Sequence, residues 1–488
     1  MAEPSTQAEG RTAVELPTKY LPAVTYRDLP EPRRLRNYMG ASIILSATAL
    51  GSGELILWPN IATQVGMGLA WLSVLGISMQ FFLNMEIERY TLVTGETAVT
   101  GFSRMWLPWG VIFVLGAILP NLFPGWATSG ATVFTFIFGM PESAMPMVAT
   151  IFLVAIGLAV TVSPVIYRTI ERAEAVMVAV IVLFIIVAII IASTADAWTG
   201  VITQIPNGIG NMPSYFDELG VASLLGAVVF AGAGGANNLV QSNYLRDKGL
   251  GMGIHIPNIV SPITGEEVAA PSLGYYPPDN ADNRRRWNRW WRIANQEQAI
   301  TFWFIGASLL VGMAVLAYST VGIDKSAEGL DFIKLEGQDL AGQIGPWFET
   351  FFYVAAFLML FSTNIGVVDY VSRLAGDSLK ITFLKDSQFW SESKIYVTTI
   401  WLLIVMGSLI VWTGIEPVVL LIISAVGGGF VMAVYSVLLL LLNRKHLPGY
   451  AKLRGYRVPV MVFISLFYIV FALYLIYQMV TQGPGSVV

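Results

Sequence analysis

"GSGELILWPN", residues 51–60, interrupts an apolar stretch that begins at Tyr38. It contains two glycines, a serine, a proline and the carboxylate Glu54. A charged side chain at the bilayer centre costs roughly 2.5–3.5 kcal/mol on insertion scales, and Gly and Pro free backbone groups that lipid cannot satisfy. The stretch is therefore either a kinked helix whose Glu54 faces a polar cavity, or a broken helix whose backbone and carboxylate bind a ligand. We favour the broken helix.

The composition indicates an integral membrane protein. Of the 488 residues, 55% are hydrophobic and only 12% are charged, whereas globular proteins average about 25% charged residues. The absence of cysteine excludes disulfides and thiolate metal ligands. The two histidines, His255 and His446, fall in predicted loops, which excludes a buried histidine metal site. The net charge of −4 says nothing about nucleic acid.

Apolar runs of about 20 residues predict eleven transmembrane helices. We place them near 38–65, 68–90, 107–137, 143–164, 169–193, 219–244, 299–322, 346–372, 395–414, 417–442 and 457–481. With the N-terminus in the cytosol, 26 of the 28 Lys and Arg residues lie in inner segments, which leaves Lys325 and Lys334 outside. By the positive-inside rule the protein is expected in the cell membrane with a cytosolic N-terminus. An odd number of helices puts the C-terminus on the extracellular or periplasmic side.

Two polar segments flank or interrupt the expected transmembrane domain, 38–488. Residues 1–37 lack the apolar core of a signal peptide and are expected to form a cytosolic tail. The loop 247–298 is rich in Pro and Gly and ends in "RRRWNRWWR". A helix would place Trp287, Trp290 and Trp291 on one face, which suits an amphipathic helix on the inner leaflet. Arg beside Trp can also bind nucleic acid, but a position between membrane spans argues against that partner.

A second interruption lies in the sixth expected span. The centre of that span, "AGAGGANN" (Ala231–Asn238), contains three glycines and two asparagines. Small residues also serve close helix packing, which would explain the glycines but not the asparagines. Spans one and six are the first helices of two five-helix halves, 1–5 and 6–10. Interrupted helices at matching places indicate an inverted-repeat transporter with its substrate near the bilayer midplane.

The chain resembles the natural resistance-associated macrophage protein (Nramp) family over about residues 38–445. The resemblance rests on "GSGELILWPNIATQVGMGLAW" (51–71), "YTLVTGETA" (90–98), "FGMP" (138–141), "IERAEAVM" (170–177) and "NNLVQSNYL" (237–245). It implies an all-α, leucine-transporter-like fold of the amino acid–polyamine–organocation superfamily, with two inverted five-helix repeats and broken helices one and six. The loop 247–298 would be an insertion.

The resemblance also implies a binding site, at which this chain departs from the family pattern. The family's Asp-Pro-Gly-Asn is replaced by Gly51–Glu54, and its Met-Pro-His-Asn by Gly235–Asn238, of which only the last residue matches. The expected substrate-binding residues are Gly51, Ser52, Gly53, Glu54, Gly235, Asn237 and Asn238. Those expected to contact a metal ion are Glu54, Asn237 and Asn238.

The changed residue types alter the expected chemistry of that site. Carboxylate and amide oxygens favour hard ions, whereas thioether and imidazole ligands favour later transition metals. In the third helix, Gly116 and Phe123 stand where the resemblance places proton-route carboxylates, so coupling by the family's route is not expected.

Other polar residues of the spans have simpler explanations. Asp369 and Glu86 are expected to pair with Arg373 and Arg89, about one helical turn away. The glycines of 427–429 are expected to serve packing or a hinge. Ser362, Thr363 and Asn364 could line the cavity, although Ser and Thr often bond to their own helix.

Three functions remain open, and the chain shows no nucleophile–base pair or cofactor motif that would indicate an enzyme. The first is transport of a hard divalent cation, similar to Mg²⁺ and partly hydrated, by alternating access. The second is transport of a small organic cation or amine on the same fold. The third is a non-transporting Nramp-like receptor or sensor. The sequence fixes neither the coupling ion nor the oligomeric state.

Overall fold

The computed structural model describes residues 10–32, 45, 49–162, 166–257, 273–324 and 329–482, with no side-chain placement for 166–175 and 482. Its strands are β1 (Thr12–Ala13), β2 (Val24–Tyr26) and β3 (Tyr275–Tyr276). Its helices, π- and 3₁₀-segments included, are η1 (Leu50–Leu57), α3 (Trp58–Val65), η2 (Gly66–Leu69), α4 (Ala70–Thr94), α5 (Ala98–Met105), α6 (Trp109–Asn121), α7 (Gly125–Phe138), η3 (Glu142–Ala144), α8 (Met145–Thr161), α9 (Ile166–Ala192), α10 (Ala195–Thr203), α11 (Ile205–Gly210), α12 (Met212–Leu219), α13 (Val221–Val229), α14 (Asn237–Asp247), η4 (Gly251–His255), α15 (Ala281–Gln298), η5 (Ala299–Phe304), α16 (Ile305–Thr320), α17 (Asp331–Ile344), α18 (Pro346–Thr382), α19 (Glu392–Val411), α20 (Pro417–Lys445) and α21 (Arg457–Gln482).

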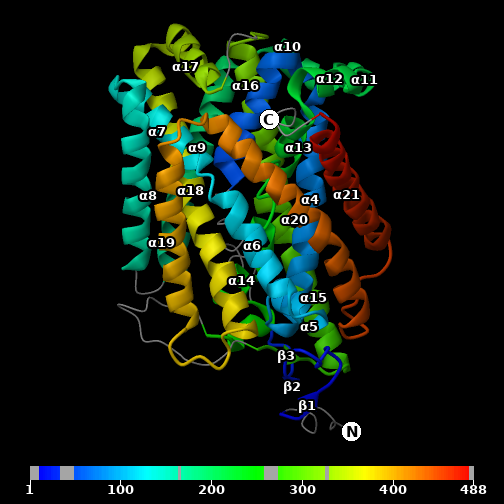
Figure 1. Cartoon of the computed structure of the whole chain (residues 1–488). Helices are drawn as coiled ribbons and strands as arrows, with labels where there is room; N and C mark the ends of the chain where they lie inside the picture. Colours follow the sequence, from blue (N-terminus) through cyan, green and yellow to red (C-terminus); the bar gives the residue numbers. More distant parts are fainter. Residues whose placement is uncertain are drawn as a thin grey trace.

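The long helices run beside one another between two ends of the molecule (Figure 1). The strands β1–β3 lie at one end, which we call the tail end, and α10, α11, α12 and α17 gather at the other, the far end (Figure 1). Apolar side chains from nearly every helix form one contiguous core. The longest helix, α18, packs against α7 and α19 and also against η1, so it connects the first interrupted segment to the rest of the bundle.

Eight helical stretches among the described residues are long and apolar enough to cross a membrane, or nine if the bent pair α9–α10 is one span. The end of the expected span 38–65 and the whole of 68–90 belong to a single stretch, Leu50–Thr94, and most of the residues before Leu50 in that span lie outside the described residues. The sixth expected span is not among the eight because a non-helical segment, 230–236, divides it into α13 and α14. The multi-pass helical fold is confirmed, whereas the number eleven stays a prediction.

The two expected interruptions take different forms. Residues 50–57, which contain Gly51–Glu54, form a π-helix that continues directly into α3. A π-helix has i→i+5 bonding and occurs mostly as short bulges at functional sites. The second interruption is a true break, in which Gly232, Gly234 and Gly235 have φ angles of 124°, 67° and 57°. Side chains other than glycine rarely adopt such angles, so the glycines allow the chain to leave and re-enter helix here.

The N-terminal segment 10–32 is folded onto the tail end. Strand β2 pairs antiparallel with β1 and parallel with β3, which lies in the loop before α15. The Arg104 guanidinium of α5 donates to the carbonyls of Pro17 and Pro22, at 3.2 and 2.8 Å, and forms a buried ion pair with Glu96. The described part of the expected tail is therefore a packed element, and we call residues 10–32 the N-terminal strap.

The expected amphipathic helix of the loop 247–298 exists as α15, and two of its three tryptophans are covered by protein. Trp287 and Trp290 are only 2% and 1% exposed. The Trp290 indole donates to the Pro30 carbonyl of the strap at 2.8 Å, and Trp287 stacks on Trp291. Trp287 and Trp290 therefore pack against the strap and α4, and the position of α15 on the inner leaflet stays a prediction. The pattern could not reveal this, since burial by protein and by lipid select the same residues.

Candidate functional site

The break at 230–236 is held open by one side chain, Gln80 of α4. Its amide nitrogen donates to the carbonyls of Val229 and Ala231 at 2.7 and 3.1 Å, and its oxygen accepts from the Gly234 amide at 2.8 Å. Gln80 is completely buried. These bonds replace the helical bonds that the break gives up, as buried backbone groups require. Sequence reasoning missed Gln80, although a glutamine at the centre of an apolar span was a signal.

The glycines of the two interruptions allow backbones to come close. A Cβ built on Gly53 would overlap the Phe230 carbonyl oxygen, so η1 rests directly against the break. The amide of Gly51 donates to the Thr363 hydroxyl of α18 at 2.8 Å. Gly235 lies on Gly428 of α20, and a Cβ there would be 2.9 Å from the Gly428 Cα. Gly428 thus has a packing role, as expected for the glycines of 427–429.

Gly53→Ala should therefore destabilise the protein strongly, because the new methyl group meets a backbone oxygen that cannot rotate away. Overpacking of this kind costs typically 1–3 kcal/mol and occasionally more. The measurement is the thermal unfolding midpoint in detergent. Gly130→Ala on α7 is the matched control, since its Cβ would only touch Leu360 at 3.4 Å. Equal stability of the two variants would contradict the close packing of the two interruptions.

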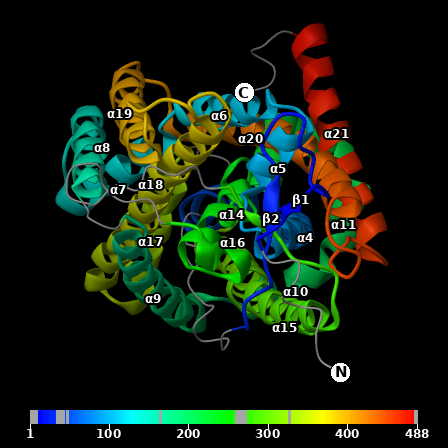
Figure 2. The same cartoon turned by 90° about the horizontal axis from the view of Figure 1, so that it is seen from below.

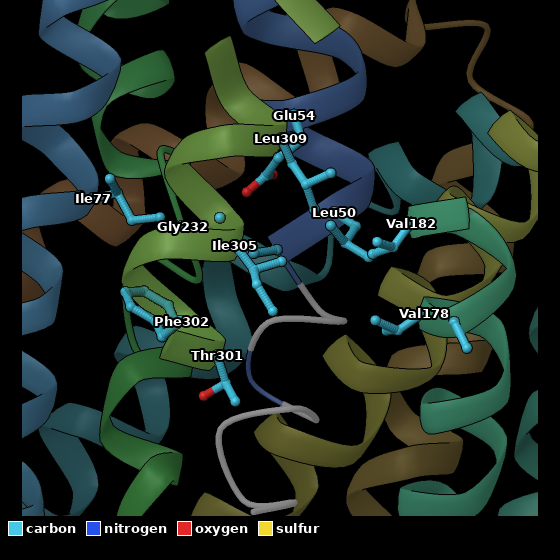
Figure 3. Close-up of a pocket in the computed structure, with 13 residues that line it drawn as sticks. Leu50, Glu54, Ile77, Val178, Val182, Gly232, Thr301, Phe302, Ile305 and Leu309 are labelled. Atoms are coloured by element: carbon cyan, nitrogen blue, oxygen red, sulfur yellow. The ribbon is translucent and has the colours of Figure 1, made fainter. Parts of the chain in front are cut away.

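Glu54 lies in the wall of an otherwise apolar cavity of about 300 Å³ (Figure 3). The wall comes from η1, α4, α9, the break, and the helix η5–α16. It includes Leu50, Glu54, Ile77, Val178, Val182, Gly232, Thr301, Phe302, Ile305 and Leu309. The Glu54 carboxylate is completely buried, and neither oxygen has a hydrogen-bond partner among the described residues. A buried carboxylate without a donor or a cation is costly.

Asn237 and Asn238 begin α14, just after the break, and do not line the cavity around Glu54. Asn238 donates to the Tyr435 hydroxyl at 3.0 Å and to the Gln80 oxygen at 3.4 Å. The amide oxygens of both asparagines are buried, and in the described part of the chain neither accepts a hydrogen bond. Gly232 lines the Glu54 cavity and also contacts Gln80. Gln80 therefore lies between the two groups of predicted ligands.

The remaining predicted site residues supply backbone and packing. Ser52 is buried, and its hydroxyl donates to the Ala49 carbonyl of its own helix at 3.3 Å. Gly51, Gly53 and Gly235 make the close contacts described above. Among the described residues there is no group of three or more His, Cys, Asp or Glu side chains that could hold a metal ion. Among the predicted site residues, the groups that could bind an ion are the Glu54 carboxylate, the side-chain amides of Asn237 and Asn238, and backbone carbonyls.

Buried ion pairs connect the helices at the tail end. Arg373 of α18 pairs with Asp369, at 2.7 Å, and with Asp247 of α14. Arg246 pairs with Asp377 of α18 and with Glu392 at the start of α19. The expected pairing of Asp369 with Arg373 is confirmed.

A second buried pair lies on α4 at the same end. Arg89 bonds to Glu86 at 2.6 Å, which confirms the other expected pairing. Two arginines share this carboxylate, because Arg457 at the start of α21 also approaches Glu86, at 3.3 Å.

At the far end a separate cavity of about 500 Å³ reaches down between α3, α12 and α20. Its polar wall residues are Asn60 and Gln64 of α3, Glu218 of α12, and Ser223 and Glu416. Leu57, the last residue of η1, also lines this cavity, so the cavity borders the segment that carries Glu54. Buried ion pairs thus join α14, α18 and α19 at the tail end, whereas α3, α12 and α20 border a polar cavity at the far end.

A family model described as natural resistance-associated macrophage protein-like matches residues 42–478 of the chain. The chain belongs to the Nramp family. This confirms the resemblance seen in the sequence, and membership indicates a membrane protein of metal ion transport. No curated protein sequence matches this chain as a relative.

Solved structures similar to this Nramp protein share its fold at low sequence identity. A histidine-to-alanine mutant of the Eremococcus coleocola manganese transporter has a TM-score of 0.63 at 13% identity, covering 92% of this chain and 89% of the other. The same transporter in complex with an aromatic bis-isothiourea compound has a TM-score of 0.60 at 13% identity, covering 98% and 92%. MhsT in complex with L-phenylalanine has a TM-score of 0.52 at 13% identity, covering 92% and 98%. The leucine-transporter-like fold is therefore confirmed.

The third helix of this Nramp protein contains Gly116 and Phe123 at the positions where the family resemblance places proton-route carboxylates. The helix is interrupted between these two positions and just after them. It consists of α6 and α7, separated by 122–124, with Pro120 inside α6 and Pro124 before α7. A Cβ on Gly116 would lie 2.8 Å from the Val431 Cγ2 of α20, so a larger side chain at this position would require Val431 to shift.

Proposed function

We propose that this Nramp protein transports a hard divalent cation, similar to Mg²⁺, by alternating access. Glu54, Asn237 and Asn238 are its proposed ligands, together with backbone carbonyls of the two interruptions. The observation that carries the proposal is the set of buried oxygens without donors: both oxygens of Glu54 and the amide oxygens of Asn237 and Asn238. Buried acceptors that lack a donor are rare and indicate a water or an ion that completes them.

The chemical types of the proposed ligands indicate which ions the site would bind. It contains one carboxylate and neutral oxygens but no sulfur or imidazole, so nothing in it selects Mn²⁺ or Cd²⁺ over Mg²⁺. Mg²⁺ keeps several waters and binds through one or two carboxylates. In the conformation described here Glu54 and the asparagines lie on different sides of Gln80, so binding would require η1 and α14 to approach each other. The π-turn at 50–57 and the glycine break are the segments that can absorb such a movement.

Alternating access is supported by the arrangement of the helices that carry or contact the two interrupted segments. Ion pairs connect α14, α18 and α19 at the tail end, while a polar cavity of about 500 Å³ reaches toward η1 at the far end. We infer that this conformation admits cargo from the far end. The Gly116 and Phe123 positions carry no titratable group, so we propose transport without the family's proton route.

The cavity around Glu54 favours a second candidate cargo. About 300 Å³ with mostly Leu, Ile, Val and Phe in its wall suits a small organic cation whose amine contacts Glu54. A hydrated Mg²⁺ would find few partners for its waters among those side chains. The two cargoes differ in their use of the asparagines, which the organic cation would not need.

Flux into proteoliposomes separates these cargoes. We expect Mg²⁺ uptake that Mn²⁺ and Cd²⁺ do not outcompete at equal concentration, without acidification of the lumen. Selective submicromolar Mn²⁺ binding in calorimetry would contradict the hard-ion site. Uptake of small amines without any divalent ion would establish the second candidate, and a substrate-dependent proton flux would assign proton transfer to another group.

The proposed orientation places the tail end in the cytosol, because 26 of the 28 Lys and Arg residues fall in segments assigned to that side. A tag before Met1 should be inaccessible to a membrane-impermeant label in intact cells, and a tag after Val488 should be accessible. The opposite labelling pattern would reverse the direction of every helix relative to the membrane.

A further inference from the structure

A cavity at the tail end is lined by basic and aromatic side chains that the transport site does not use. Its volume is about 510 Å³, and it lies between α15 and the loop from α20 to α21. Figure 2, seen from the tail end, shows α15 near the orange segment that leads from α20 into α21. The lining residues are Arg89, Trp287, Asn288, Trp291, Arg292, Asn295, Gln296, Tyr450, Lys452, Arg454, Tyr456 and Arg457, none of which is acidic.

The inner wall of this cavity has more positive than negative charge. Arg89 and Arg457 are 5% and 6% exposed and share one carboxylate, that of Glu86. Both guanidinium groups lie over the Trp291 ring, at 4.0 and 4.9 Å from its centroid. They are thereby fixed in place, and one of the two charges has no counter-ion.

Three further cations stand at the rim. Arg292 belongs to α15, and Lys452 and Arg454 belong to the loop before α21. In the described part of the chain none of the three forms a hydrogen bond or ion pair through its side chain. Two carboxylates, Asp279 and Asp28, lie near Tyr450 in the wall, and Asp279 pairs with Arg284 at 2.8 Å. The cavity thus carries an excess of about four positive charges that the protein does not neutralise.

Polar donors complete the cavity. Asn288, Asn295 and Gln296 line it from α15. The Tyr450 hydroxyl is buried and has no hydrogen-bond partner among the described residues, although its ring lines the same cavity. Guanidinium, ammonium, amide and hydroxyl donors around one space are the groups that bind a phosphate.

The position relative to the membrane identifies the source of that phosphate. The candidate span of α21 begins at Arg457, in the cavity wall. Further along this helix, Phe463 and Leu466 are 51% and 56% exposed, and on η5 Phe304 is 62% exposed. Exposed apolar side chains on spanning helices face lipid. The cavity therefore opens where the acyl chains of a lipid end and its head group begins.

We propose that this cavity binds the phosphate head group of an anionic phospholipid in the leaflet at the tail end. The phosphate would lie between the rim cations Arg292, Lys452 and Arg454, and Tyr450 would donate to it from the wall. Basic pockets between spanning helices are known to bind anionic head groups. Because the wall joins α4, α15 and α21, the bound lipid would hold these helices together. The proposal is independent of the identity of the transported cargo.

Lipid binding to the purified full-length protein tests the proposal, measured by native mass spectrometry in detergent. Phosphatidylglycerol should bind at least tenfold more tightly than phosphatidylcholine. The combined variant Arg292→Gln, Lys452→Gln, Arg454→Gln should bind phosphatidylglycerol on the order of a hundredfold more weakly, since each basic residue near an anionic surface contributes about fivefold. Its affinity for phosphatidylcholine should not change. The three residues are on the surface or at the rim and have no partners to lose, so the variant should fold.

The matched control removes three exposed cations from the same end but outside the cavity, Lys385→Gln, Arg444→Gln and Lys445→Gln. It should retain the preference for phosphatidylglycerol. Equal binding of both lipids, or an equal loss in the control, would overturn the proposal. Inorganic pyrophosphate serves as a water-soluble probe of the same cavity. If pyrophosphate binds through the same three residues and the protein binds phosphatidylglycerol no more tightly than phosphatidylcholine, the assignment to a lipid is wrong.

Discussion

Replacing Glu54 by glutamine should weaken cargo binding ten- to hundredfold while nearly preserving the shape of the side chain. The carboxylate has no hydrogen-bond donor among the described residues, so the cargo is its expected partner. Loss of a charge-assisted contact costs about 1.5–3 kcal/mol, which corresponds to this range of affinity. The measurements are cargo affinity by calorimetry and uptake into proteoliposomes. The same variant should also unfold at a higher temperature without cargo, because it removes an uncompensated buried charge.

Glu336→Gln provides the control for this experiment. Glu336 of α17 is the other completely buried carboxylate with no partner for either oxygen in the described chain, and it lies at the far end, away from Glu54. Burial and the nearby Asp339 raise the pKa of Glu336 to about 8. A folded-state pKa above the unfolded one means that stability falls as pH rises from about 4.5 toward 8. Glu336→Gln should remove that pH dependence and leave cargo affinity unchanged. Raised stability with full transport in Glu54→Gln would instead show that Glu54 does not bind cargo.

Asn237→Ala distinguishes the two candidate cargoes. If a divalent ion bridges Glu54 and Asn237, the double variant with Glu54→Gln should be no worse than Glu54→Gln alone. If the cargo is an organic cation in the apolar cavity, Asn237→Ala should have little effect on affinity. Independent, additive losses would contradict a single shared site.

Arg104→Gln should cost about 3–5 kcal/mol of folding stability, the largest effect expected outside the transport site. Arg104 and Glu96 are both completely buried, and removal of one partner leaves the other as an uncompensated charge. The substitution also removes the bonds to Pro17 and Pro22, so the strap should be cleaved by a protease at low concentrations that spare the wild type.

Burial of the Glu96 carboxyl opposes ionisation, but the paired Arg104 holds its pKa below the ordinary value. The stability from this pair is therefore present above about pH 4.5 and lost as pH falls through the lowered pKa.

Arg286→Gln is the comparison for Arg104→Gln. Arg286 also contacts the strap, through Glu31 at 3.0 Å, but this pair is 24% and 52% exposed. Exposed ion pairs contribute about 0–1 kcal/mol. A loss in Arg286→Gln as large as that in Arg104→Gln would show that attachment of the strap, rather than the buried charge, sets the stability.

The sequence was informative at positions where the residue type is unusual for a transmembrane span. Glu54 and the glycines of 231–238 violate the apolar composition of a span, so they could be located without the structure. Gln80 also departs from the apolar composition of a span. Its hydrogen-bond partners, however, lie about 150 positions away in the sequence, and no local pattern identifies such partners. The division of the predicted ligands into two groups, with Asn237 and Asn238 outside the Glu54 cavity, depends on helix placement that periodicity does not determine.

The N-terminal strap was predicted only as a polar tail for a similar reason. Its strands are two or three residues long and have no alternation that could be recognised. Its position depends on single contacts, such as that of Leu29 with Asn283, to helices whose own placement is set by the whole bundle. The strap covers part of the face that carries Trp287 and Trp290, so the burial of these side chains could not be predicted without the position of the strap.

The pairing of β2 with β3 also sets an order of events during synthesis. Tyr26 pairs with Tyr276, so the pair β2–β3 cannot form until some 250 further residues have left the ribosome. At about 5–20 residues per second this delay is roughly 12–50 s, long enough for the earlier spans to insert into the bilayer first. During that time the carboxylate of Glu96 lacks the Gly274 amide, which donates to it in the folded protein. The arrival of β3 therefore completes the three-stranded sheet while the helices α15 to α21 are still to be made.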